Sequence, residues 1–300
     1  MARKLPKQDP SIKDVLERNE IFADLFNAFA FHGNPVLRAE ELQPADTAYA
    51  DVLETTKGFE TIGKYRDKVR KTARGTLFVI LAVEAQDKVH YAEPVKVMLY
   101  DALSYTAECK TLANAQGTGR LTADEYLSRT RKGTKLTPVF TLVLYTGEKP
   151  WDGPRSLYDM LDIHERLKPF VPDYPINMID LGHDEDIPYQ SAFLQKLSAA
   201  MYALYHEMFD CDLVVENEVL SIAAVLANDR DLYKKAIENE GGAIRMCEAL
   251  KKLRDLGKLE MLFSLVEDGS LTVDRGADKI GMTLEEFKDS YEEWLKGKEK

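Results

Sequence analysis

The sequence predicts an α/β protein in which a mixed sheet flanked by helices is followed by an all-helical extension. Residues 76–86 (TLFVILAVEAQ) and 137–147 (TPVFTLVLYTG) are apolar runs of strand length that end in polar or turn residues. Nearly everything after Pro188 has helical periodicity. We therefore expect an α/β domain over residues 1–187 and a helical region over residues 188–300 that ends in a small helical hairpin.

The chain opens with a predicted helix. Residues 11–30 carry apolar side chains at helical spacing, with Ser11 available as the cap. The segment HGNP (32–35) is expected to end this helix, and residues 36–56 have no regular pattern. An irregular connection therefore leads from the first helix to the sheet.

The next elements are two strands and a helix. Residues 63–71 alternate in polarity and precede a turn at 73–76, so they predict a strand that pairs with the run 76–86. Because the second strand is almost wholly apolar, we expect it to be buried on both faces. The helix expected over residues 94–115 begins at a proline, which suits a first helical turn.

The remaining elements are shorter. The sequence predicts, in order, a loop over 116–135 with a short helical piece in 122–129, the strand 137–147, a short helix over 156–163 and a strand over 177–182. Glycines at 241–242 and Gly257 are expected to break the later helices.

The net charge of −11 is unevenly distributed. Residues 1–150 carry 22 basic and 20 acidic residues, whereas residues 151–300 carry 18 and 31. The stretch from Lys57 to Arg74, both included, has seven basic residues against Glu60 and Asp67. Because salt confines an electrostatic field to about 8 Å, this stretch can bind phosphate although the chain is acidic, and a solvated hairpin face is the alternative.

The sequence favours a protein of a reducing cytoplasm that does not enter membranes. Its 3 cysteines are widely spaced, which argues against a disulfide framework and a structural zinc site. No apolar run approaches membrane-spanning length, and the polar N-terminal stretch lacks the features of a secretion signal.

Two carboxylates and an amide form the main candidate site. Asp67 lies on the first predicted strand, and Glu84 and Gln86 end the second, where residues two apart point to the same face. Unpaired carboxylates at the edge of an apolar core are unfavourable, and a Mg²⁺ or Mn²⁺ ion between Asp67 and Glu84 would offset that cost. Surface pairs of Asp67 with Arg66 and of Glu84 with Lys88 are the alternative.

The surroundings of these residues resemble a known family. The segments YRDKVRK (65–71), FVILAVEAQDKVHYAEPVKVMLYDALSY (78–105) and LTPVFTLVLYTGEKPWDGPRSLYDML (136–161) are similar to the PD-(D/E)XK nuclease-family transposases, also called recombination-promoting nucleases. Residues 19–47 and 265–288 share this similarity. The resemblance implies a restriction-endonuclease-like core, Mg²⁺- or Mn²⁺-dependent cleavage of double-stranded DNA and a link to recombination.

The resemblance also implies a set of site residues. The family's aspartate falls on Asp67, and its (D/E)-x-(K/Q) pair falls on Glu84 and Gln86. Its N-terminal helical acid, a further metal ligand, falls on Glu20, with Asp24 equally available.

One segment departs from the family pattern. Where the family commonly has Met-Pro-Val-Arg, this chain has Glu93-Pro94-Val95-Lys96. Lys96 keeps the positive charge but not the bidentate geometry of arginine, so it is either a catalytic substitute for the missing ExK lysine or a solvated helix residue. Glu93 is either exposed or alters the charge of the site.

The expected partners follow from these residues. Double-stranded DNA is expected to contact the basic residues of the first strand, with a homodimer as a candidate assembly; these residues are Lys64, Arg66, Lys68 and Arg70. The C-terminal segment resembles a helix-turn-helix with Gly281 in its turn, but its second helix is acidic and predicts a packing or protein-binding role. The alternative function is a catalytically silent nuclease-like scaffold that acts as a protein-interaction module.

Overall fold

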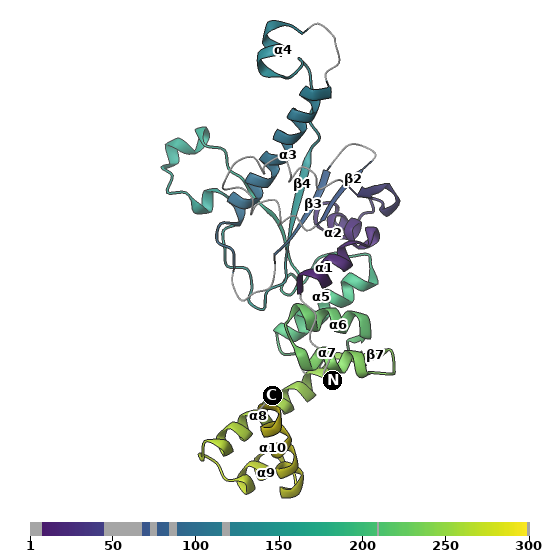
Figure 1. Cartoon of the computed structure of the whole chain (residues 1–300), viewed down its shortest axis with the longest axis vertical. Helices are drawn as coiled ribbons and strands as arrows, with labels where there is room; N and C mark the ends of the chain where they lie inside the picture. The colour runs from purple at the N-terminus through teal and green to yellow at the C-terminus, as the bar shows by residue number, and fades with distance from the viewer. Residues whose placement is uncertain are drawn as a thin grey trace.

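The computed structural model describes residues 8–44, 68–72, 77–83, 89–115, 121–208 and 210–298. In Figure 1 the molecule is elongated, with a sheet and its helices in the upper part and a small group of helices at the lower end. The chain is a mixed α/β protein, as expected. Among the described helices, none is both long and apolar enough to cross a membrane.

Five strands form the main sheet in the order β1-β2-β3-β4-β5. The strands β1 to β3 are antiparallel neighbours, and β4 and β5 add parallel to β3. Between β3 and β4 the chain runs through α3 (Glu93–Ala115), the crossover helix that a parallel pair requires. The strand bounds are β1 Leu42–Pro44, β2 Lys68–Thr72, β3 Leu77–Val83, β4 Val139–Tyr145 and β5 Asn177–Asp180.

The strand β4, which lies between β3 and β5, is mostly apolar because both of its faces are covered. Leu142 and Leu144 pack into a core with the N-terminal helices, whereas Val143 and Tyr145 pack into a second cluster that contains Val97 of α3. Successive strand residues face opposite sides, so a strand covered on both faces is apolar at most positions.

The predicted first helix is two helices. α1 (Gln8–Leu16) and α2 (Asn19–Phe31) are separated at Arg18, whose backbone is extended. The amide of Asn19 donates to the carbonyls of Ala39 and Leu42, which fastens the start of α2 to the segment that enters β1. This tertiary contact, which the helical pattern of residues 11–30 does not reveal, accompanies the break.

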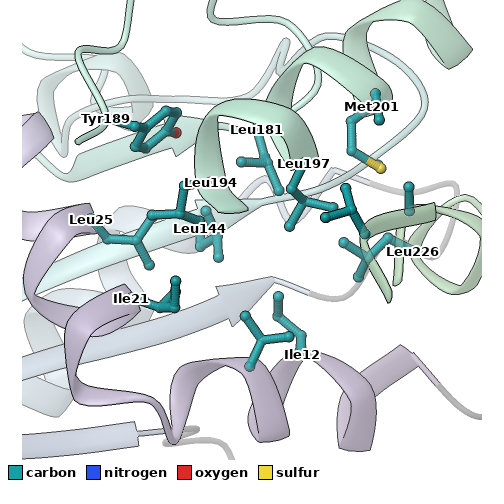
Figure 2. Close-up of a cluster of buried hydrophobic side chains, with 14 of the residues drawn as sticks. Ile12, Ile21, Leu25, Leu144, Leu181, Tyr189, Leu194, Leu197, Met201 and Leu226 are labelled. Carbon is teal, nitrogen blue, oxygen red and sulfur yellow. The ribbon is translucent and has the colours of Figure 1, made fainter. Parts of the chain in front are cut away.

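The main core continues past the expected boundary at residue 187. Figure 2 shows side chains from α1, α2, β4 and the later helices converging, including Ile12, Leu144, Leu197 and Leu226. One cluster of buried residues extends from Ile12 to Leu250. The first helices after residue 187 therefore belong to the same core as the sheet; they are α5 (Ala192–Tyr205), α6 (Asn217–Leu226) and α7 (Arg230–Glu238).

Several local predictions need correction. Residues 36–56 were expected to be irregular, but η1 (Ala39–Glu41) and β1 lie within them. The short helix expected over 156–163 is reduced to the 3₁₀ turn η5 (Tyr158–Met160), which η6 (Glu165–Phe170) follows. Among the helices after Pro188, β6 (Val214–Glu216) and β7 (Ala243–Arg245) pair as a small antiparallel sheet. The short helix α4 (Ala123–Ser128) is present as expected, with Thr122 and Glu125 forming its capping box.

The C-terminal helices form a separate small cluster. α8 (Met246–Glu267) continues through Gly257, so the break expected there is wrong. The end of α8 packs against α9 (Val273–Ile280) and α10 (Leu284–Lys298) around Phe263 and Phe287, and Gly281 forms the turn between the last two helices as predicted. This group lies at the lower end of the molecule in Figure 1.

Two glycines of this region predict opposite effects of alanine. A Cβ at Gly276 would lie 2.6 Å from Cζ of the buried Phe287, whereas a Cβ at Gly257 would meet nothing within 4 Å. We expect Gly276→Ala to destabilise the cluster by about 1–3 kcal/mol through overpacking, and Gly257→Ala to stabilise α8 by about 0.5–1 kcal/mol. Urea unfolding followed by the fluorescence of Trp294, in a Trp151→Phe background, measures both. Equal effects of the two substitutions would contradict this packing.

Candidate functional site

The residues of the main candidate site adjoin strand ends. Asp67, Glu84 and Gln86 lie outside the described residues, as do Lys64 and Arg66. The neighbouring strands are described, and Lys68, the first residue of β2, pairs with Ile80, the middle residue of β3. Val83 at the end of β3 pairs with Tyr145, which in turn pairs with Asp180. The ends of β3, β4 and β5 therefore lie together at one edge of the sheet, here called the C-terminal edge, and β2 begins opposite the middle of β3.

A buried ionic group lies at the start of α3. Glu93 is fully buried, and its two carboxylate oxygens accept hydrogen bonds from Nζ of Lys96 at 3.1 and 3.2 Å. Nδ1 of His90 lies 3.1 Å from one of these oxygens. Of the two alternatives for Glu93, exposure is therefore wrong. The ammonium of Lys96 is held by a carboxylate one helical turn before it.

The start of α3 packs against the turn that follows β4. A Cβ at Gly153 would lie 2.6 Å from Cγ1 of Val89, and the hydroxyl of Tyr91 lies 3.3 Å from the Asp152 carboxylate. Trp151 is buried edge-on against the ring of Tyr145, so it anchors this turn by packing. The group around Glu93 is thus adjacent to the loop that leaves the C-terminal edge.

A second buried carboxylate lies at the C-terminal edge itself. Oδ1 of Asp180 is 2.8 Å from Nδ1 of His183, and Oδ2 accepts a hydrogen bond from the backbone N–H of Trp151 at 3.0 Å. Nε2 of His183 lies 3.1 Å from the carbonyl oxygen of Glu148. These contacts join the end of β5 to the turn after β4.

The environment of Asp180 predicts a pH dependence. Burial raises the pKa of this carboxyl, although the hydrogen bonds from His183 and Trp151 act in the opposite direction. A raised folded-state pKa means that the stabilising contribution is present at low pH and is lost as the pH rises through that pKa. We therefore expect the unfolding free energy of the wild type, relative to Asp180→Asn, to decrease between about pH 4 and pH 7 in urea titrations. An increase over this range would show that the imidazole interaction outweighs burial.

Arg70 lies inside the fold. Its guanidinium donates to Oε2 of Glu17 at 2.8 Å and to Oδ1 of Asn19 at 3.0 Å, and it lies over the ring of Phe22. These contacts hold β2 to the junction of α1 and α2, which gives Arg70 a structural role. A contact of Arg70 with DNA stays a prediction, as does one of Lys68 in β2.

The two acids considered on α2 differ in their surroundings. Glu20 is exposed in the first turn of the helix. Asp24 is buried and accepts hydrogen bonds from the backbone N–H groups of Gln190 and Ser191, at the start of α5. Asp24 therefore ties α2 to α5, whereas a role of Glu20 in metal binding stays a prediction.

For two of the buried carboxylates, the local sequence does not predict the burial. Glu93 begins an amphipathic helix and Asp180 ends a short strand, positions where acids are commonly exposed. Asp101 on α3 is likewise buried and accepts hydrogen bonds from the hydroxyls of Thr141 and Tyr174. Within the described part of the chain, no three His, Cys, Asp or Glu side chains gather as metal ligands would.

Comparison of the chain with family models, with curated proteins and with solved structures finds no match. Any function therefore rests on the residues of this chain and on their placement.

Proposed function

We propose that this protein is a metal-dependent endonuclease that hydrolyses phosphodiester bonds of double-stranded DNA in a restriction-endonuclease-like core and acts in recombination or transposon movement. Asp67 and Glu84 would hold the metal, with Glu20 as a further ligand. Carboxylates are hard oxygen donors, which suits Mg²⁺ or Mn²⁺. A bound ion of this kind supplies an activated water and charge stabilisation at the scissile phosphate.

The observation that carries the proposal is the register of β2 and β3. Lys68 pairs with Ile80 in an antiparallel register, so β2 begins opposite the middle of β3, and its first residue is the one on the side where β3 ends. Asp67 directly precedes Lys68 in the chain, and Glu84 directly follows Val83. In this proposal both carboxylates lie on that side of the sheet, where one ion would bind both. The mixed sheet with α3 between β3 and β4 also agrees with the core that the resemblance implies.

The remaining residues have distinct roles in this proposal. Gln86 would orient the attacking water or contact the phosphate, since an amide brings no charge. Lys96 would stabilise the negative charge that develops on the phosphate. Glu93 fixes the ammonium of Lys96 through two hydrogen bonds, and it also offsets part of that positive charge. The basic residues Lys64, Arg66 and Lys68 would contact the DNA backbone.

The same pairing favours a second candidate function. If Glu93 neutralises Lys96 and Gln86 supplies no charge, neither Lys96 nor Gln86 offsets the charge that develops on the phosphate, and the protein is a silent scaffold that binds a protein partner. Its interaction surface would be the acidic second half, where residues 151–300 carry 31 acidic and 18 basic residues.

Nicking of supercoiled plasmid DNA tests the proposal. We expect the purified full-length protein to produce open-circular DNA with Mg²⁺ or Mn²⁺ and no product with excess EDTA. Catalase, an enzyme with no nuclease activity, purified in the same way serves as the control for contaminating nucleases. An unchanged plasmid with both metals would favour the silent scaffold.

A further inference from the structure

A pocket that plays no part in the proposed hydrolysis opens beside α5. Its volume is about 440 Å³, which is within the range of small-molecule sites. One wall is a single face of α5, and the others are the segments that precede and follow this helix. The lining includes Gln195, Ser198 and Tyr202 of the helix, Asp184 and Tyr189 before it and Met208 after it.

The wall contains a buried hydroxyl without a partner. Tyr189 is 4% exposed, and its hydroxyl makes no hydrogen bond to any described residue. Leaving a buried hydroxyl unpaired costs about 1–3 kcal/mol. Burial raises the pKa of Tyr189, and the charges of Asp184 and Asp24 raise it further, so the phenol stays protonated. A ligand in this pocket could supply the missing partner.

The charged residues that line the pocket are acidic. Asp184 and Glu185 line the pocket, and none of its described lining residues is a lysine, arginine or histidine. Asp184 accepts one hydrogen bond, from the backbone N–H of Asp180, and Glu185 accepts one from the hydroxyl of Tyr202. Each carboxylate has further acceptor capacity, because an ionised carboxylate offers about four lone-pair sites.

The rest of the lining is mainly apolar. Ile187, Ala199, Ala203 and Leu213 contribute side chains without polar groups, and Tyr202 adds an aromatic ring. An apolar body can therefore lie along the helix face while a positive group lies near the two carboxylates. Aromatic rings also attract organic cations through their faces.

We propose that this pocket binds a small organic cation, an ammonium group attached to an apolar body. The ammonium would donate to the carboxylates of Asp184 and Glu185 and to the phenol oxygen of Tyr189. The apolar body would pack between α5 and Leu213. This proposal does not depend on the metal site, so a failure of the proposed nuclease activity would not overturn it.

Binding of phenethylammonium to the full-length protein tests the charge preference. By calorimetry at pH 8 we expect saturable binding, and binding at least about tenfold weaker for the neutral phenethyl alcohol and for the anion 3-phenylpropionate. Absence of phenethylammonium binding up to about 10 mM would overturn the proposal. Equal affinity for the three compounds would do the same.

Substitutions test the location of the site. Asp184→Asn, Glu185→Gln and Tyr189→Phe are each expected to weaken phenethylammonium binding severalfold, whereas the exposed control Asp162→Asn leaves it unchanged. Tyr189→Phe should leave the stability of the free protein equal or higher, because it removes an unpaired hydroxyl. Unaltered affinity in all three variants would place binding elsewhere and overturn the proposal.

Discussion

Replacement of Asp67 or Glu84 by alanine is expected to abolish metal-dependent plasmid nicking. Each carboxylate would supply one of the few protein ligands of the metal, and its loss removes both the ion and the activated water. We expect the rate to fall by at least about a thousandfold, which corresponds to roughly 4 kcal/mol of lost transition-state stabilisation. Gel quantification of open-circular DNA over time measures this effect.

The control for this pair is a carboxylate of the same segment. Asp87 lies three residues beyond Glu84 and outside the proposed ligand set, so Asp87→Ala is expected to keep most of the activity. Urea midpoints close to the wild-type value would show that the variants remain folded. Nicking that persists in both Asp67→Ala and Glu84→Ala would contradict the assignment of these residues as metal ligands.

Replacement of Asp24 by alanine is expected to have the largest effect on stability. The buried carboxylate accepts hydrogen bonds from the N–H groups of Gln190 and Ser191, and alanine would leave both donors unpaired at the start of α5. We expect a loss of about 2–4 kcal/mol, since hydrogen bonds to charged groups contribute about 1.5–3 kcal/mol each and both bonds are partly buried. Urea unfolding followed by far-UV circular dichroism measures this difference.

Glu20 on the same helix is the matched control. Its exposed side chain predicts that Glu20→Ala changes the unfolding free energy by less than about 0.5 kcal/mol. Equal effects of Glu20→Ala and Asp24→Ala would contradict the contact between α2 and α5. The two substitutions also distinguish a structural role from metal binding, because only Glu20 is a proposed metal ligand.

The sequence predicted the elements whose pattern is decided locally. β4 and β5 are bounded by turn residues, and α3 begins at a proline-containing turn, so their placement follows from short-range signals. β1 was not predicted, because its residues Leu42–Pro44 are too few to establish an alternation. The break between α1 and α2 depends on contacts of Asn19 with residues 20 or more positions away, which no periodicity reveals.

For the candidate site, the sequence predicts which residues take part but not which of their neighbours are buried. Spacing and resemblance predict Asp67, Glu84 and Gln86, and these residues lie outside the described part of the chain, so the site stays a prediction. The burial of Glu93 was not predictable, because an acid in a first helical turn is usually exposed and favourable there. Burial of a charge depends on which other parts of the chain cover it, and that is a property of the tertiary structure.

Titration of the full-length protein with Mn²⁺ by isothermal calorimetry tests the central claim most directly, because it detects the metal site without requiring DNA cleavage. The account predicts saturable binding that is lost in Asp67→Ala and in Glu84→Ala and retained in Asp87→Ala. Absence of Mn²⁺ binding in the wild type, or binding that persists in both ligand variants, would contradict it.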